Sequence, residues 1–453
     1  MEPVAYILIL PLTAAIISLA FEGLAGLFTP ILSLATAAVS ADMLMRGYTV
    51  SNGTFHADWY SIVTVSMISW LYFFASLSSL HYVKRVERPF FRLRLYWALL
   101  SLFALSMIFT AVVSNLGWMW IGLEGTTIVS ALLIITDGKK RNVEGAWRYM
   151  IIASAGLGIA FLSVVVAYSS AGTLDITRLT LPEKTAVLVS LLGLIGFGTK
   201  AGIFPMHSWL PDAHGSAPSP VSAMLSGTLL PTALLVYMRI FHAAMEVTSK
   251  PVYPALAAGI LTIMVASVLM ASQRFLKRLL AYSSMDVMGI ALTGIALSYY
   301  HPKLLRLVFI LLAVHALSKG ALFISGGSLV RAYGTHEIEE IGGVLSSTRL
   351  TGYTFVLSAL SVTGAPPFAT FPAELVVVGS AFIYSRWWAL LTGTGILLSF
   401  LALNWHSMRM VFGEERDVEL SLREEAVPFV MMLVALGISL YVWYLMAEGG
   451  LIL

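Results

Sequence analysis

A lysine, an aspartate and two histidines lie close together in a stretch that begins as an apolar segment. Lys200 lies inside this segment, and His207, Asp212 and His214 follow a proline, Pro205. A lysine at membrane depth costs about 2.5–3.5 kcal/mol on insertion scales, so it is usually kept for a partner or a proton. Proline opens the helical hydrogen-bond ladder, which a membrane tolerates only where protein or water satisfies the freed groups. A buried ionisable group beside a broken helix indicates an ion path.

The two histidines allow more than one interpretation. Histidine titrates near physiological pH, so His207 and His214 could relay a proton. The segment Pro-Asp-Ala-His that ends at His214 could equally form a turn and cap a helix. A metal site is not favoured, because the spacing of these histidines and Asp212 is irregular and no fourth ligand is near.

Further ionisable residues interrupt other apolar segments. Glu124 is the single charged residue between Leu116 and Ile135. It could pair with Lys200, or stay protonated and bind a neighbour by a hydrogen bond. His315 and Lys319 are four residues apart and share a helix face, where two positive charges would repel, so one of them is expected to be neutral. Lys319 could instead donate to a backbone carbonyl.

The composition predicts an all-α integral membrane protein. Of the 453 residues, 58% are hydrophobic and 11% are charged, whereas soluble proteins carry about 25% charged residues. Cysteine is absent, which excludes thiolate-held iron–sulfur clusters, disulfides and a cysteine nucleophile within this chain. No basic segment precedes the first apolar stretch, so we expect a spanning helix there and not a cleaved signal peptide. Nothing indicates a nucleic-acid partner.

Apolar segments of about 20 residues predict fourteen transmembrane helices. They are 4–21, 24–45, 59–82, 95–113, 115–136, 146–168, 185–210, 221–245, 251–272, 279–300, 304–331, 351–381, 386–411 and 426–446. One of the two alternating sets of loops holds most of the lysine and arginine residues. By the positive-inside rule this set is cytoplasmic, which places both termini on the outer side of the cell membrane.

Two of these segments are interrupted by proline in similar ways. The seventh contains Pro205, and the twelfth contains Pro366 and Pro367. They are five segments apart, which predicts two five-helix repeats, spans 4–8 and 9–13, with the second inverted because five is odd. The predicted organisation is three helices, a first repeat, a second repeat and a last helix, at 1–94, 95–245, 251–412 and 413–453.

The stretch from Lys200 to Pro218 resembles the broken seventh helix of a known family. This family comprises the antiporter-like subunits of respiratory complex I, of group 4 membrane-bound [NiFe] hydrogenases and of Mrp antiporters. Its signature, Lys-x-x-x-x-Pro-x-His-x-Trp-Leu-Pro-x-Ala-His-x-x-Ala-Pro, is present here at every fixed position. The resemblance covers about residues 95–412 and is strongest to hydrogenase-4 component F and the M-type complex I subunit. It implies that proton or ion translocation involves Glu124, Lys200, His207, His214, Asp286, His315, Lys319 and Glu374.

Two positions distinguish this chain from many members of that family. Complex I subunits usually carry a second lysine where this chain has Pro231, a helix-breaking residue, which puts a standard lysine relay in doubt. Asp286 corresponds to an acidic residue of the hydrogenase relatives, although it could also cap a helix. Glu374 follows the second break and would be the counterpart of Lys200. The roles of Asn404 and His406 are open.

The resemblance implies an ion-translocating subunit, expected to carry protons in preference to sodium, driven by a redox reaction elsewhere in a membrane complex. It implies no catalysis, metal or cofactor in this chain. Iron–sulfur, NiFe or quinone sites would belong to partner subunits, among which sister antiporter-like subunits are expected. The alternatives are an Mrp-type Na⁺/H⁺ antiporter subunit, a quinone-linked complex I subunit and a non-conducting structural subunit.

Overall fold

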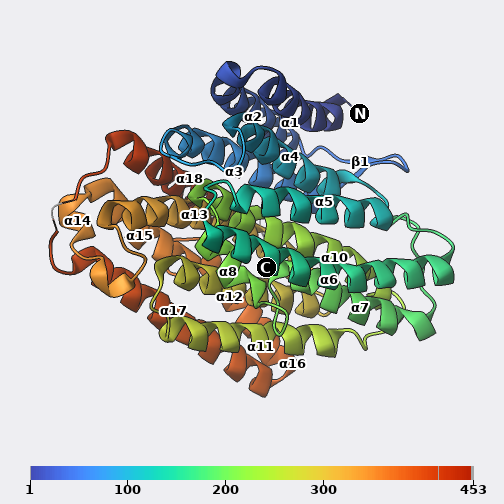
Figure 1. The fold of residues 1–453 in the computed structure, drawn as a ribbon. Helices are drawn as coiled ribbons and strands as arrows, with labels where there is room; N and C mark the ends of the chain where they lie inside the picture. The colour runs from blue at the N-terminus through green and yellow to red at the C-terminus, as the bar shows by residue number, and fades with distance from the viewer. Residues whose placement is uncertain (1, 417, 450–453) are drawn as a thin grey trace. The chain divides into compact units, whose positions relative to one another are not determined.

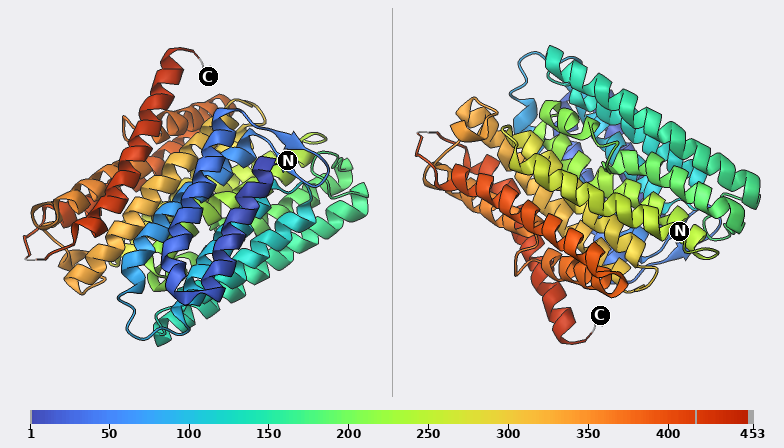
Figure 2. Two further views of the ribbon diagram at one scale, coloured as in Figure 1. Left: turned by 90° about the horizontal axis from the view of Figure 1, so that it is seen from above. Right: turned by 90° about the horizontal axis from the view of Figure 1, so that it is seen from below.

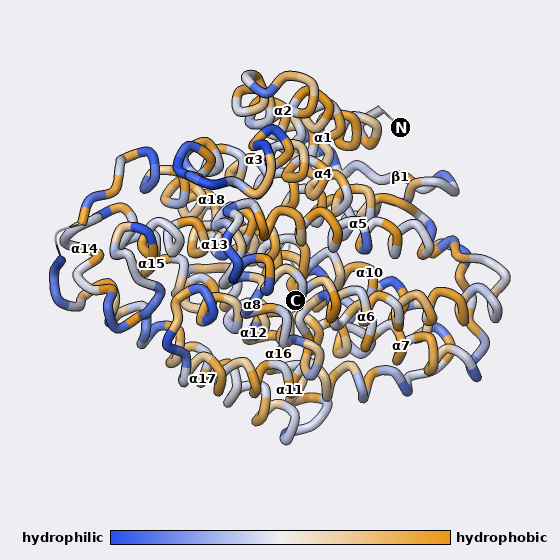
Figure 3. Tube along the Cα trace, in the orientation of Figure 1, coloured by the Kyte–Doolittle hydropathy of each residue, from blue (hydrophilic) through white to orange (hydrophobic). Residues whose placement is uncertain are grey.

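Long apolar helices make up most of the computed structural model, which describes residues 2–416 and 418–449 (Figure 1). Thirteen of the described helices are long and apolar enough to cross a membrane, and α16 is a shorter apolar helix. Hydrophobic residues follow the helices, and hydrophilic residues concentrate in the connections between them (Figure 3). The prediction of an all-α membrane protein with about fourteen spans is confirmed.

The chain divides into two compact units, Met1–Ala255 and Leu256–Leu453. The first unit contains α1 (Glu2–Ala20), α2 (Glu22–Met45), β1 (Val50–Ser51), β2 (His56–Ala57), α3 (Trp59–Val83), α4 (Leu93–Val112), α5 (Leu116–Ile134), α6 (Lys140–Ala171), α7 (Glu183–Ala201), α8 (Trp209–Ser216), α9 (Ser219–Met224), a π-helical turn (Leu225–Leu229) and α10 (Leu230–Met245). The two strands form an antiparallel hairpin between α2 and α3.

The boundary between the two units lies in the first turn of α11 (Val252–Ala271), so most of this helix belongs to the second unit. Its further elements are α12 (Leu276–Leu297), α13 (Leu304–Tyr333), a 3₁₀ turn (Ile338–Glu340), α14 (Val344–Ser347), α15 (Arg349–Val362), α16 (Thr370–Tyr384), α17 (Arg386–Phe412) and α18 (Leu422–Ala447). Whether the two units contain inverted five-helix repeats stays a prediction.

Each unit is built around one deeply buried helix. In the first unit, nearly every residue of the span formed by α9, the π turn and α10 is buried, and α10 contacts α3, α4, α5 and α7. The N-terminal helices α1–α4 lie side by side, as the blue ribbons of Figure 2 show. In the second unit, α13 contacts α12, α15, α16 and α18. Polar groups on these central helices are therefore removed from lipid.

Proline has different effects at the three predicted positions. Pro205 lies in the gap between α7 and α8, and Pro366 and Pro367 lie in the gap between α15 and α16. Pro231, by contrast, does not break its span, which runs from Ser219 to Met245 much as the predicted segment 221–245 does. It lies in the first turn of α10, directly after the π-helical turn. The wider turn accommodates a residue that has no N–H to donate, and the helix continues.

Candidate functional site

Lys200 lies in the last turn of α7 and is fully buried. Its Nζ donates to Thr127 Oγ1 of α5 at 2.6 Å and to Tyr149 OH of α6 at 2.7 Å. Tyr149 OH is also hydrogen-bonded to Ser130 Oγ at 2.8 Å. Three helices thus place a lysine against a row of buried hydroxyl groups. Hydroxyls both donate and accept, so they can pass a proton along such a row.

Glu124 lies one helical turn before Thr127 on α5 and is half-buried. Its Oε1 accepts a hydrogen bond from Ser154 Oγ at 2.9 Å, and within the described residues its buried Oε2 has no hydrogen-bond partner. The predicted pairing with Lys200 is therefore not a direct ion pair. The two groups interact electrostatically, and the hydroxyls of Thr127 and Tyr149 occupy two of the three donor positions of the lysine.

Glycines bring α6 and α7 close enough for Tyr149 to reach Lys200. A Cβ atom at Gly156 of α6 would lie 2.4 Å from Thr199 Cβ, and one at Gly196 of α7 would lie 2.3 Å from the backbone nitrogen of Ala160. Small residues allow membrane helices to approach each other in this way. The contact between these two helices therefore positions the hydroxyl row.

The break after α7 folds back onto the same site. Gly202 ends the helix in the left-handed region, with φ of +75°. Trp209 Nε1, at the start of α8, donates to the carbonyl oxygen of Thr199 at 2.8 Å. The Trp209 ring also lies 4.8 Å from the ring of Tyr149. A side chain beyond the break thus adds a second donor to a carbonyl at the end of α7, which also accepts from the Gly202 N–H at 3.2 Å.

The histidines and Asp212 occupy separate surroundings. His207 lies in the break and is half-buried, and His214 is fully buried in α8. Asp212 lies beside Arg148, with 3.3 Å between Oδ2 and Nη1. Ser222 donates to the backbone oxygen of His214 at 3.3 Å. The structure therefore places His214 close to the start of the buried α9–α10 span, and it directs Asp212 toward Arg148.

The second unit holds another buried lysine, Lys319 of α13. It donates to the backbone oxygen of Leu280 at 2.8 Å and to Ser283 Oγ, both on α12. The alternative in which Lys319 donates to a backbone carbonyl thus describes one of its two contacts. His315 is fully buried one turn earlier on α13. The lysine again combines complete burial with a hydroxyl partner.

Two buried carboxyl groups accompany Lys319. Asp286 accepts a hydrogen bond from Ser399 Oγ of α17 at 2.7 Å and interacts electrostatically with Lys319. It lies in the middle of α12, whose N-cap is Phe275, so the helix-cap alternative for Asp286 is wrong. Glu374 of α16 is buried and interacts electrostatically with Asp286. Asp286 therefore interacts electrostatically with both Lys319 and Glu374.

Residues of α17 complete this part of the second unit. Asn404 Nδ2 donates to Thr363 Oγ1 and to the backbone oxygen of Phe400, each at 2.9 Å. Thr363 is the C-cap residue of α15, so Asn404 braces the start of the second break. His406 forms hydrogen bonds with the backbone at the end of α11. These two residues, whose roles the sequence leaves open, hold helices together around the break.

Comparison with known proteins shows which family this chain belongs to. Residues 113–401 match the family model described as NADH:quinone oxidoreductase/Mrp antiporter, transmembrane. This chain belongs to that family. The match lies inside the region for which the sequence motifs indicate the resemblance, and it confirms that prediction.

Relatives and a solved structure resemble most of the chain. A hydrogenase-4 component F homolog from Methylacidiphilum infernorum is 29% identical over 86% of this chain and 85% of its own length. The NADH-quinone oxidoreductase subunit M of Rhodobacter capsulatus is 27% identical over 84% of this chain and 78% of its own. A chain of the membrane-bound sulfane sulfur reductase, an archaeal respiratory membrane complex, has the same fold, with a TM-score of 0.87 at 18% identity over 99% of this chain and 97% of that chain.

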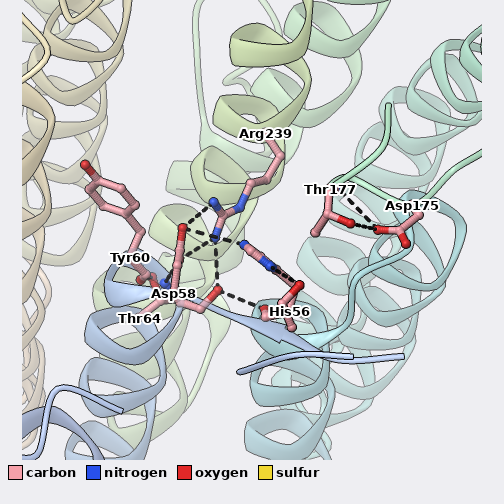
Figure 4. A network of polar contacts seen from close by, with 9 residues as sticks. His56, Asp58, Tyr60, Thr64, Asp175, Thr177 and Arg239 are labelled. Carbon is pink, nitrogen blue, oxygen red and sulfur yellow. Dashed lines mark hydrogen bonds and ion pairs between the residues drawn. The ribbon is translucent and has the colours of Figure 1, made fainter. Parts of the chain in front are cut away.

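A polar network at the start of α3 in this chain was not predicted from its sequence. Arg239 lies in α10 and donates two 2.6 Å hydrogen bonds to the carboxylate of Asp58 (Figure 4). Asp58 also caps α3 by accepting from the backbone N–H of Ser61 at 2.9 Å, and His56 Nε2 lies 3.8 Å away. Burial raises the pKa of Asp58, but the nearby His56 ring and the hydrogen-bonded guanidinium of Arg239 outweigh it and hold that pKa well below its usual range. The pair is a permanent ion pair that joins α3 to α10.

We expect Asp58→Asn to lower the free energy of unfolding by about 3 kcal/mol, because it leaves the buried Arg239 charge unpaired. Asp58 has a depressed pKa in the folded state, so its contribution is present above its unfolded value of about 3.9 and is lost as the pH falls. Thermal unfolding in detergent should therefore differ between the two proteins at pH 7, and the difference should begin to shrink only as the pH falls below about 4. Asp42→Asn, which disrupts an exposed pair with Arg46, is the control and should change stability by less than about 1 kcal/mol. An equal loss in both variants would contradict a special role for Asp58.

Proposed function

We propose that this chain is the proton-translocating subunit of a membrane-bound respiratory complex, in which a redox reaction in partner subunits drives proton movement. The observation that carries this proposal is the pair of fully buried lysines, Lys200 and Lys319, each on a different unit and each donating to buried hydroxyl groups. Intramembrane ionisable residues with such partners mark ion pathways. Membership of a family that includes NADH:quinone oxidoreductase and Mrp antiporter subunits supports it.

Lysine suits the role of a switching proton carrier. Its ammonium group gives up a proton more readily than guanidinium when it is buried, and each of its states has hydrogen-bond partners in the hydroxyl row. In the first unit, Glu124 would respond to the charge on Lys200 and pass that change on through Ser154 and the hydroxyl row. In the second unit, Lys319, Asp286 and Glu374 would hand a proton between a base and two acids.

The partners in this proposal are membrane subunits of a complex I-like or hydrogenase assembly, including sister antiporter-like subunits. Iron–sulfur clusters and NiFe or quinone sites would lie in those partners, as would the bond chemistry. Both termini would face the outer side of the membrane, because the opposite loops hold most of the lysine and arginine residues.

The choice between protons and sodium can be tested with the intact complex in sealed vesicles. Electron transfer should produce a pH gradient in sodium-free buffer, and a protonophore should abolish that gradient. Sodium uptake that persists in the presence of the protonophore would contradict proton translocation and favour the sodium alternative.

A further inference from the structure

The carboxyl group of Glu374 lies directly against the α-carbon of Gly364 in the break between α15 and α16. A side-chain carbon at position 364 would lie 2.0 Å from Glu374 Oε2, 2.5 Å from its Cδ and 2.9 Å from its Oε1. Such distances are far shorter than van der Waals contact, so any residue with a Cβ would displace the carboxyl group. Glycine at position 364 therefore leaves the space that the carboxyl group of Glu374 occupies.

The backbone supplies a second reason for glycine at this position, and the two reasons can be separated. Gly364 has a φ of +67°, in the left-handed region that residues with a Cβ adopt at a cost. Gly334, which follows α13 in the same unit, has nearly the same φ, +68°, but no atom lies within 4 Å of the position of its Cβ. Gly334 thus shares the conformation of Gly364 without the contact.

The location of Glu374 explains how its carboxyl group reaches Gly364. It is the fifth residue of α16, and side chains of a helix lean toward its N-terminus, which here is the break. The carboxyl group therefore lies between the end of α15, where carbonyl groups are left open, and the start of α16, where N–H groups are left open. The two ends have opposite effects on a carboxylate, so small displacements change how tightly the group holds a proton.

Glu374 is 95% buried, and within residues 2–416 and 418–449 its side chain forms no hydrogen bond or ion pair. Its electrostatic interaction with Asp286 acts at a distance and sets no orientation. The space left at Gly364 therefore bears directly on where the carboxyl group lies.

We propose that Gly364 is a positioning residue that seats the carboxyl group of Glu374 in the gap between the two half-helices. Its missing side chain allows the carboxyl group to lie at the break, where it exchanges a proton. This inference rests on the proposed translocation function, because it assigns a role to a residue that acts through Glu374.

The test compares redox-driven proton translocation by the intact complex with Gly364→Ala and with Gly334→Ala. We expect Gly364→Ala to slow translocation at least about tenfold, since a misplacement of about 1 Å is enough for such losses, and to shift its pH profile. Gly334→Ala carries the same backbone cost and should leave the rate and the profile close to those of the wild type. Equal losses in both variants would show that the left-handed backbone alone requires glycine.

A second replacement tests the contact itself. Aspartate is one methylene shorter than glutamate, so Glu374→Asp should withdraw the carboxyl group from position 364. The double variant Gly364→Ala/Glu374→Asp should then translocate protons faster than Gly364→Ala alone. If Gly364→Ala does not assemble, the same double variant should restore assembly. The proposal is overturned if the double variant translocates protons no faster than Gly364→Ala, or if it fails to assemble where Gly364→Ala fails.

Failure of the underlying function would look different. Glu374→Gln keeps the shape of the side chain and removes its ability to exchange a proton. Wild-type translocation in this variant would remove Glu374 from the proton path, whatever the result at Gly364. A slow Glu374→Gln with a normal Gly364→Ala would keep the function and reject the positioning role.

Discussion

Replacement of Lys319 by methionine should abolish proton translocation while the complex still assembles. Methionine has a similar length and is readily accommodated in a buried helix, so the packing of α13 should survive. The replacement removes the charged donor to Leu280 and Ser283 and leaves Asp286 without its nearby cation. A buried acid without that cation can no longer exchange its proton with a base. The measurement is the initial rate of the redox-driven pH change in vesicles.

Lys303→Met provides the control on the same helix. Lys303 is exposed at the start of α13, so its replacement removes one positive charge without touching the buried site. Its translocation rate should match that of the wild type. A wild-type rate of translocation in Lys319→Met would exclude Lys319 from the proton path. Its contacts with α12 would then have only a structural role.

Removal of the Tyr149 hydroxyl should slow translocation by about 10²-fold, the usual contribution of a positioned proton-transfer group. The Tyr149→Phe replacement keeps the ring that lies beside Trp209 and beneath Lys200. It breaks the hydroxyl row, because Lys200 loses one of its two acceptors and Ser130 loses its only hydroxyl partner among the described residues, keeping the backbone oxygen of Thr126. The loss should therefore appear in the rate, with thermal unfolding changed by no more than about 1–2 kcal/mol.

Tyr168→Phe is the matched control for this effect. Tyr168 lies on the same helix, α6, but is exposed. Removing its hydroxyl should leave translocation unchanged. If both tyrosine variants translocate protons at the wild-type rate, the hydroxyl of Tyr149 has no part in proton transfer, and Lys200 must exchange its proton by another route.

The helices and the buried charges are the features that the sequence predicts well. Membrane spans need about 20 apolar residues, so their number follows from hydropathy. Ionisable residues in such spans are rare enough that Glu124, Lys200, Lys319 and Glu374 stand out one by one. In both cases the membrane restricts which residue types are allowed: a span must be apolar, and a charge within it is costly. These restrictions hold wherever the residue lies in the fold.

The partners of these charges are less visible in the sequence. Serine and threonine are common in membrane helices, where they bind the carbonyl of the preceding turn, so Thr127 and Ser283 carry no distinctive mark. Tyr149 is one hydroxyl-bearing residue among many until the close approach of α6 and α7 is known. Position along a helix and packing between helices decide these contacts, and neither is written in a local pattern.

Two features of α10 do not follow from local sequence patterns. A π-helical turn lies directly before Pro231 and accommodates its missing N–H, so the span continues. Arg239 lies in the same helix and binds Asp58, which lies 181 residues earlier in the chain. Partners so distant in sequence are set by the tertiary fold.

The most direct test of the account is the number of protons moved per electron by the intact complex in sealed vesicles, with the wild-type chain and with Lys200→Ala. The account predicts that the variant assembles and that its ratio of protons to electrons falls, because this chain no longer carries protons. An unchanged ratio in a fully assembled variant would contradict it, and would leave this chain a scaffold beside a sister subunit through which the protons move.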